Sequence, residues 1–91
     1  MEVVLTRHAR EMAGRRQIDE TLIREVARQP EQRVEGAEGA VVLQSRFTDA
    51  QTGKGMLLRL VAEERQGRVR ILTVYKTSRI EKYWRRQGGR P

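Results

Sequence analysis

Apolar residues in the first third of the chain recur at helical spacing and predict two short helices. The first runs over about 7–15, with Thr6 as its N-cap, and the second begins after Asp19 and ends before Pro30. The preceding residues, 2–5, read either as a short strand or as a lead-in to the first helix.

From residue 31 onward apolar and polar positions alternate, which is typical of strands on a half-buried sheet. The predicted strands cover 31–35, 40–48, 55–65 and 68–76. A terminal helix over 77–86 follows, with Ile80, Tyr83 and Trp84 on one side. The predicted fold class is α+β: two N-terminal helices pack on one face of a four-stranded antiparallel sheet, and a short C-terminal helix ends it.

The turn at Gln66-Gly67 sets the register of the last hairpin. Arg65 then lies opposite Arg68, Glu63 opposite Arg70, Ala62 opposite Ile71, Leu60 opposite Thr73, and Leu58 opposite Tyr75. Pairing Thr48 with Gly55 in the preceding hairpin places Val41, Leu43, Ser45 and Phe47 beside Ala62, Leu60, Leu58 and Met56. Both hairpins therefore agree on one apolar face, and we expect the helices to cover it.

The opposite face of the sheet is half apolar and half basic. It is expected either to be exposed or to be covered by the C-terminal segment or a partner chain. Its residues are Gln44, Arg46, Leu57, Arg59, Val61, Arg70, Leu72, Val74 and Lys76.

The chain has 91 residues, which suits one domain, expected over 1–86, with a disordered tail over 87–91. It has no cysteine, so disulfides, thiolate nucleophiles and cysteine-based metal sites are excluded. No apolar run reaches the roughly 20 residues of a membrane span, and no signal peptide is visible at the N-terminus. A cytoplasmic protein is the default expectation.

The formal net charge of +7 is concentrated at one end of the chain. Residues 1–65 hold 11 basic and 11 acidic side chains, whereas 66–91 hold 8 basic side chains and the single acid Glu81. Such a patch suits a polyanion, an acidic protein or an anionic membrane, and its alternative interpretation is a solvated basic tail.

The residues that remain for chemistry form a metal-free set, and no cofactor or metal site is predicted. Cleavage of RNA by its own 2′-hydroxyl needs a base, an acid and cations that stabilise the charged transition state. Arg46, Arg59 and Lys76 are predicted to form a phosphate clamp on the exposed face, with His8 or Tyr83 as acid or base. RNA contacts are expected from a wider basic set: Arg70, Arg79, Lys82, Arg85 and Arg86.

Each of these residues also has a purely structural interpretation. His8 is then a surface residue of the first helix, Arg46 and Arg59 solvate the sheet, and Tyr75 belongs to the core. Tyr83 and Trp84 either stack on bases or pin the terminal helix to the sheet.

The order of elements and several short motifs resemble the RelE/ParE toxin superfamily and, more closely, a related group of small bacterial proteins of unknown function. The motifs are His8-Ala9-Arg10-Glu11-Met12, Ile18-Asp19, Pro30-Glu31 and Val74-Tyr75-Lys76-Thr77-Ser78. The resemblance implies a four-stranded antiparallel sheet, an antitoxin that covers the basic face, and either mRNA cleavage, on or off the ribosome, or gyrase poisoning. It also implies catalysis by sheet Arg and Lys residues, matched by Arg46, Arg59 and Lys76, with Tyr83 or Tyr75 near the C-terminus.

Two functions follow as expectations. The first is a toxin of a toxin–antitoxin pair acting as a metal-independent endoribonuclease. The alternative is a non-catalytic interaction module of the same fold, which forms a homo-oligomer or binds an acidic partner through its sheet face. Leu57, Val61, Leu72 and Val74 favour the alternative.

Overall fold

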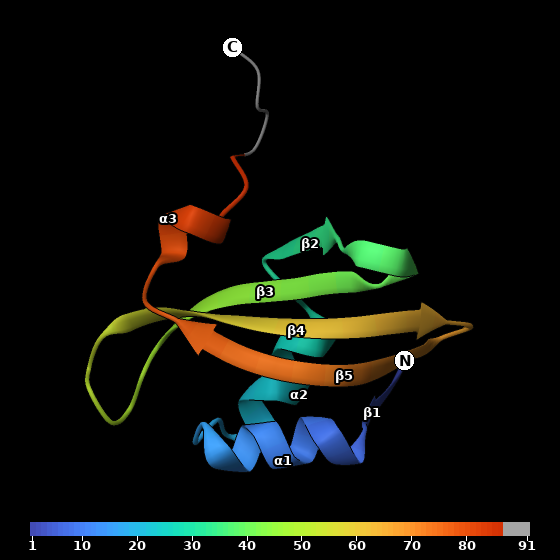
Figure 1. Ribbon diagram of the computed structural model, residues 1–91, viewed down its shortest axis with the longest axis horizontal. Helices are drawn as coiled ribbons and strands as arrows, with labels where there is room; N and C mark the ends of the chain where they lie inside the picture. Colours follow the sequence, from blue (N-terminus) through green and yellow to red (C-terminus); the bar gives the residue numbers. More distant parts are fainter. Residues whose placement is uncertain (87–91) are drawn as a thin grey trace.

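The computed structural model describes residues 1–86 and forms one mixed sheet with helices on both faces (Figure 1). The elements in chain order are β1 (Glu2–Leu5), α1 (Arg7–Arg15), α2 (Glu20–Arg28), β2 (Gln32–Glu35), a 3₁₀ turn (Ala37–Gly39), β3 (Val41–Thr48), β4 (Gly55–Arg65), β5 (Arg68–Thr77) and α3 (Ile80–Tyr83). The strand order is β1-β5-β4-β3-β2, in which β1 runs parallel to β5 and the other neighbours are antiparallel.

The prediction of a four-stranded antiparallel sheet is therefore wrong. Residues 2–5 form a fifth strand at the sheet edge, and the two N-terminal helices follow this strand instead of opening the fold. Val3 and Leu5 are buried in the core. Four residues are too few to establish an alternating pattern, and a parallel partner more than 60 residues away along the chain leaves no turn signal in the sequence.

The two helices begin where their capping residues predict. The Thr6 hydroxyl accepts a hydrogen bond from the Ala9 amide at 3.0 Å, and the Asp19 carboxylate accepts one from the Thr21 amide at 2.8 Å. Their apolar sides cover one sheet face, as expected. The buried residues between the helices and this face form the hydrophobic core: Val3, Leu5, Ala9, Ala13, Ile18, Ile23, Val26, Ala27, Val41, Leu43, Leu58, Leu60, Ala62, Val69, Ile71 and Val74.

The register of the β3–β4 hairpin is confirmed in full, whereas that of β4–β5 is confirmed only near its turn. A bulge between Val61 and Ala62 leaves Leu72 without a direct partner, so that Ala62 pairs with Ile71 but Val61 pairs with Thr73. Beyond it, the predicted Leu60–Thr73 and Leu58–Tyr75 pairs are wrong. Arg59 lies opposite Tyr75 and Leu58 opposite Lys76, so every later side chain of β5 is on the other face from the one predicted.

The bulge coincides with the end of β1. Thr6 donates its amide to the Ile71 carbonyl at 3.1 Å and its hydroxyl to the Leu72 carbonyl at 3.2 Å. Farther along the same edge of β5, the Arg16 side chain donates from Nη1 to the Val74 carbonyl at 2.7 Å. Residues at the two ends of α1 thus supply hydrogen-bond donors to β5 carbonyls that β1 is too short to reach.

The predicted terminal helix over 77–86 is reduced to the single turn of α3. Trp84 already has extended backbone angles, and the next residue, Arg85, is hydrogen-bonded to Gln32 of β2. In Figure 1, α3 lies on one side of the strands, while α1 and α2 lie on the other. The predicted tail over 87–91 falls outside the described residues. Within the described part of the chain, none of the helices has the length and apolar character needed to cross a membrane.

Candidate functional site

The sheet face opposite α1 and α2, called the second face below, carries a cation held by neutral partners. Arg59 of β4 donates from Nε to the Gln44 side-chain oxygen at 2.8 Å and from Nη1 to the Tyr75 hydroxyl. Its guanidinium lies 4.2 Å from the Tyr83 ring centre and 5.7 Å from that of Tyr75. Among residues 1–86, no carboxylate pairs with it. Arg59 therefore presents a half-buried positive charge that no neighbouring acid neutralises.

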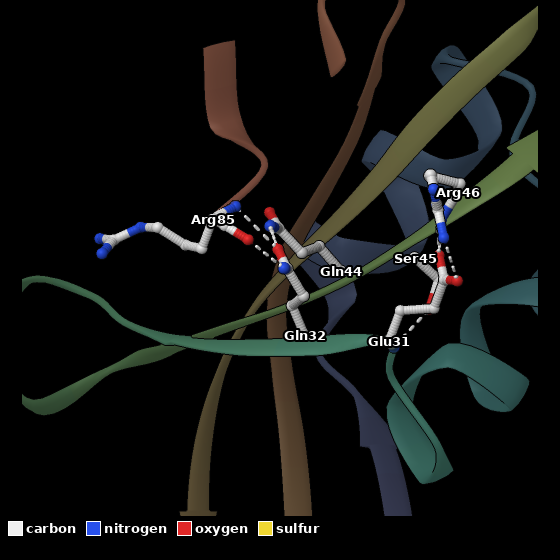
Figure 2. A network of polar contacts seen from close by, with 6 residues as sticks. All are labelled: Glu31, Gln32, Gln44, Ser45, Arg46 and Arg85. Carbon is white, nitrogen blue, oxygen red and sulfur yellow. Dashed lines mark hydrogen bonds and ion pairs between the residues drawn. The ribbon is translucent and has the colours of Figure 1, made fainter. Parts of the chain in front are cut away.

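Two glutamines hold the C-terminal segment 79–86, called the strap below, against this face. Gln44 donates to the Gln32 side-chain oxygen at 2.8 Å and to the Tyr83 carbonyl at 3.2 Å. Gln32 donates to the Arg85 carbonyl at 2.6 Å and accepts from the Arg85 amide at 3.0 Å (Figure 2). Both glutamines are buried. Because their partners in the strap are backbone groups, these contacts do not depend on the side chains of Tyr83 and Arg85.

Arg46 of β3 forms the second cationic centre of this face. Its guanidinium pairs with the Glu31 carboxylate through Nε and Nη2 at 3.1 and 2.9 Å, and its backbone amide donates to the same carboxylate (Figure 2). These hydrogen bonds lower the pKa of Glu31, while the Glu31 side chain raises the pKa of Arg46. The guanidinium also lies 4.3 Å from the Trp84 ring centre. Arg46 is thus neutralised on one side and stacked under an aromatic ring of the strap.

Lys76 does not belong to the second face, and the predicted Arg46–Arg59–Lys76 clamp is wrong as a geometric unit. The β5 bulge turns Lys76 to the helix-covered face, where its ammonium pairs with the buried Asp49 carboxylate at 2.9 Å. The side chains are 17% and 7% exposed. Hydrogen bonds from Lys76 and then Thr52 lower the pKa of Asp49. Tyr75 lies opposite Arg59 on the second face, where the predicted register had Val74.

The remaining predicted site residues are spread over the molecule. His8 is exposed on α1, on the opposite side of the sheet from Arg59. Tyr83 lies with Arg59, as an acid or base at that centre would require. Arg70 pairs with Glu63 at 3.0 Å near the Gln66 turn. The strap carries the other four predicted RNA contacts, all exposed: Arg79, Lys82, Arg85 and Arg86.

Sequence reasoning missed Gln32 and Gln44 as functional positions. It expected Tyr75 on the apolar face, while keeping it as the alternative to Tyr83. A glutamine on an otherwise basic and apolar strand face was the available signal for Gln44. Nothing local marks Gln32, because its partners lie 12 and 53 residues away in the chain.

Comparison with known protein families gives a match over most of the chain. A family model described as a domain of unknown function, DUF4258, matches residues 5–76. The chain belongs to this family. The matched region contains both helices of the core, β2, β3, β4 and all of β5 except Thr77, and it ends before α3 and the strap. No curated protein and no solved structure matches the chain significantly. Since the family description carries no function, the resemblance to the RelE/ParE toxins stays a prediction.

Proposed function

We propose that the protein binds single-stranded RNA on the second face of its sheet. The observation that carries this proposal is the environment of Arg59: a guanidinium held by Gln44 and Tyr75, flanked by Tyr83, without a carboxylate partner among the described residues. A guanidinium in this setting suits a phosphate oxygen, and its plane is a surface on which a base can stack.

The charge distribution supports the same ligand. Arg79, Lys82, Arg85 and Arg86 are exposed on the strap beside this face, and none of them forms an ion pair within residues 1–86. Arg residues that are not neutralised within the fold attract a polyanion over longer range. RNA as the ligand agrees with the cytoplasmic location expected from the sequence.

The geometry favours binding over cleavage. A transesterification centre needs a base beside the cation that stabilises the phosphorane. His8 lies across the sheet, Lys76 is paired with Asp49 on the other face, and Glu31 is engaged by Arg46. Tyr75 and Tyr83 are the candidates that lie beside Arg59 among residues 1–86, and a phenol is a poor general base near neutral pH. Endoribonuclease activity, and the toxin role with its antitoxin or ribosome, stay predictions from the sequence.

The test is the affinity of a labelled single-stranded RNA of about 10 nucleotides, measured by fluorescence anisotropy over a salt series. With about 4–6 phosphate contacts, log Kd should rise with log salt at a slope of about 3–4. Arg59→Gln should weaken binding about tenfold, because it removes a charge-assisted contact in a half-buried site.

The matched control is Arg28→Gln, which removes the same charge from an exposed position at the end of α2. We expect its affinity to stay within about twofold of the parent protein. Equal losses for both variants, or a Kd that does not respond to salt, would rule out a specific site at Arg59.

The alternative, an oligomer formed through the second face, loses most of its support. Val74 lies in the helix-covered core, because of the β5 bulge. Leu57 does lie on the second face but is fully buried. Val61 and Leu72 remain, both half-buried, and with half-buried Val42 opposite Val61 they make a small apolar patch.

A further inference from the structure

The strap lies on the two guanidiniums that would receive RNA. We propose that residues 79–86 act as an internal competitor: Tyr83 and Trp84 occupy a base-binding site for two consecutive nucleotides, and RNA binds by displacing them. This inference rests on the proposed RNA-binding function and adds to it the site's regulation and the shape of its ligand.

The first argument is the way in which the strap is held. The Arg79 amide donates to the Thr77 hydroxyl at the end of β5, and the other hydrogen bonds described between the strap and the sheet join backbone atoms of Tyr83 and Arg85 to the side chains of Gln44 and Gln32. Figure 2 shows the pair between Gln32 and Arg85. The Gln32 amide offers one donor and one acceptor side by side, and it binds the neighbouring acceptor and donor of Arg85. A base edge offers the same kind of pair, as in the bidentate contact of glutamine with adenine.

The second argument is the placement of the aromatic rings. Two consecutive residues of the strap, Tyr83 and Trp84, lie over two guanidiniums from adjacent strands, at 4.2 Å from Arg59 and 4.3 Å from Arg46. Consecutive bases of a single strand stack on cationic and aromatic planes in the same manner. The rings thus fill the positions that two bases would take.

The third argument is that the strap has little other structure to hold it. Its only helical part is the four-residue α3, which has no side-chain hydrogen bond at its N-cap. A single turn is not stable by itself, so the strap stays in place through the contacts with the sheet. Release therefore exposes Arg59, Gln32 and Gln44 together and frees the side of the Arg46 guanidinium on which Trp84 lies.

The chain supplies a reporter for this movement, because Trp84 is its only tryptophan. Acrylamide quenching of Trp84 is measured on the full-length protein, alone and saturated with an oligouridylate of about 10 nucleotides. If RNA displaces the strap, the quenching constant rises toward that of the urea-unfolded chain. A quenching constant that stays level or falls while the labelled RNA binds overturns the proposal, since the ring is then still covered.

Tyr83→Leu gives a second, independent test with an unambiguous sign. It weakens the strap and keeps every cation and the Trp84 reporter. If the strap competes with RNA, RNA should displace the weakened strap more easily. The Kd for RNA should then fall about threefold, which corresponds to the loss of one partly exposed cation–π contact. A Kd that rises instead means that Tyr83 contacts RNA directly, which overturns the proposal.

Phe47→Leu is the matched control. It also replaces an aromatic ring by leucine, but its ring packs against the core on the helix-covered face. We expect no change in Kd or in Trp84 quenching. Thermal unfolding of both variants shows whether they are folded.

The outcomes separate this inference from the proposed function. If RNA binds the parent protein and Tyr83→Leu binds it more weakly, RNA binding stands and the competitor role is overturned. If neither protein binds RNA at any salt concentration, the proposed function fails. The effect of Tyr83→Leu on Trp84 quenching in the free protein then still shows whether the ring holds the strap, and an unchanged value overturns that part as well.

Discussion

At the scale of single residues, Gln44 connects most of the second face. It is fully buried, and its amide joins Arg59, Gln32 and the Tyr83 carbonyl. Buried polar groups of this kind are stable only while all their partners are present, since each lost partner leaves an unsatisfied donor or acceptor.

Replacement of Gln44 tests this coupling. Gln44→Leu keeps the volume but leaves Arg59 Nε and the Tyr83 carbonyl without their partner, and we expect about 2 kcal/mol lower free energy of unfolding. Trp84 quenching should rise in the same variant, because the strap loses one of its anchors. Gln51→Leu in the exposed loop is the control and should stay within about 0.5 kcal/mol. Urea unfolding measures both.

Two carboxyl groups link stability to pH. The side-chain hydrogen bond from Arg46 lowers the pKa of Glu31 from 4.5, and that from Lys76 lowers the pKa of Asp49 from 3.8. A carboxyl with a lower pKa in the folded than in the unfolded state stabilises the fold above its unfolded pKa. This contribution is lost as the pH falls through the folded value.

We therefore expect the urea midpoint to stay level from about pH 7 to about pH 5 and to fall below the ordinary pKa values of these groups. The double variant Glu31→Gln, Asp49→Asn removes both titrations. Its midpoint should be lower near pH 7 and should lose less on acidification than that of the parent protein. An equal acid loss in both proteins would assign the effect to other carboxyl groups.

At the scale of elements, the junction of β1, α1 and β5 decides how the sheet is completed. Thr6 caps α1 through Ala9 and also donates to the Leu72 carbonyl at the β5 bulge. One hydroxyl thus fixes the start of the helix to the point at which β5 changes face.

Thr6→Ala should lower the free energy of unfolding by about 2 kcal/mol, because a lost N-cap costs about 1 kcal/mol and the Leu72 carbonyl loses a donor as well. Thr6→Ser keeps the hydroxyl and should recover more than half of that difference. If the serine variant is as unstable as the alanine variant, the hydroxyl is not the group responsible. Thermal or urea unfolding distinguishes the two.

At the scale of the whole molecule, the two ends of the chain complete the sheet: β1 forms one edge of it, and the strap lies on its second face. β1 contributes Val3 and Leu5 to the core from the sheet edge, and Arg24 of α2 binds the Val3 carbonyl at 2.8 Å. The strap covers part of the second face at the other end of the sequence. The net charge is also unevenly distributed along the chain, since the excess of basic residues lies in β5 and the residues after it.

Leu5→Ala tests the contribution of β1. Loss of this buried side chain should cost about 2–5 kcal/mol, a large share of the 5–15 kcal/mol that a domain usually has. Val4→Ala, on the same strand but only half-buried, should cost less than half as much. Urea unfolding followed by circular dichroism provides the comparison. Equal small losses would mean that β1 is not part of the cooperative core.

Local patterns in the sequence were sufficient for the elements and for one face of the sheet. Caps at Thr6 and Asp19, the turn at Gln66 and the alternation along β3 and β4 act over a few residues. They predicted the two N-terminal helices, the strands from residue 31 onward and the whole β3–β4 register. Arg46 and Arg59 were placed on the second face for the same reason.

Only the tertiary structure decided the parallel pairing of β1, the bulge at Leu72 and the course of the strap. Each depends on partners far apart in the chain: β1 on β5, Leu72 on Thr6, and Arg85 on Gln32. The bulge alone moved Lys76 away from the site and brought Tyr75 to Arg59, because one extra residue reverses the alternation of all later side chains. Composition and local pattern contain no signal for such a shift, which arises where a distant strand ends.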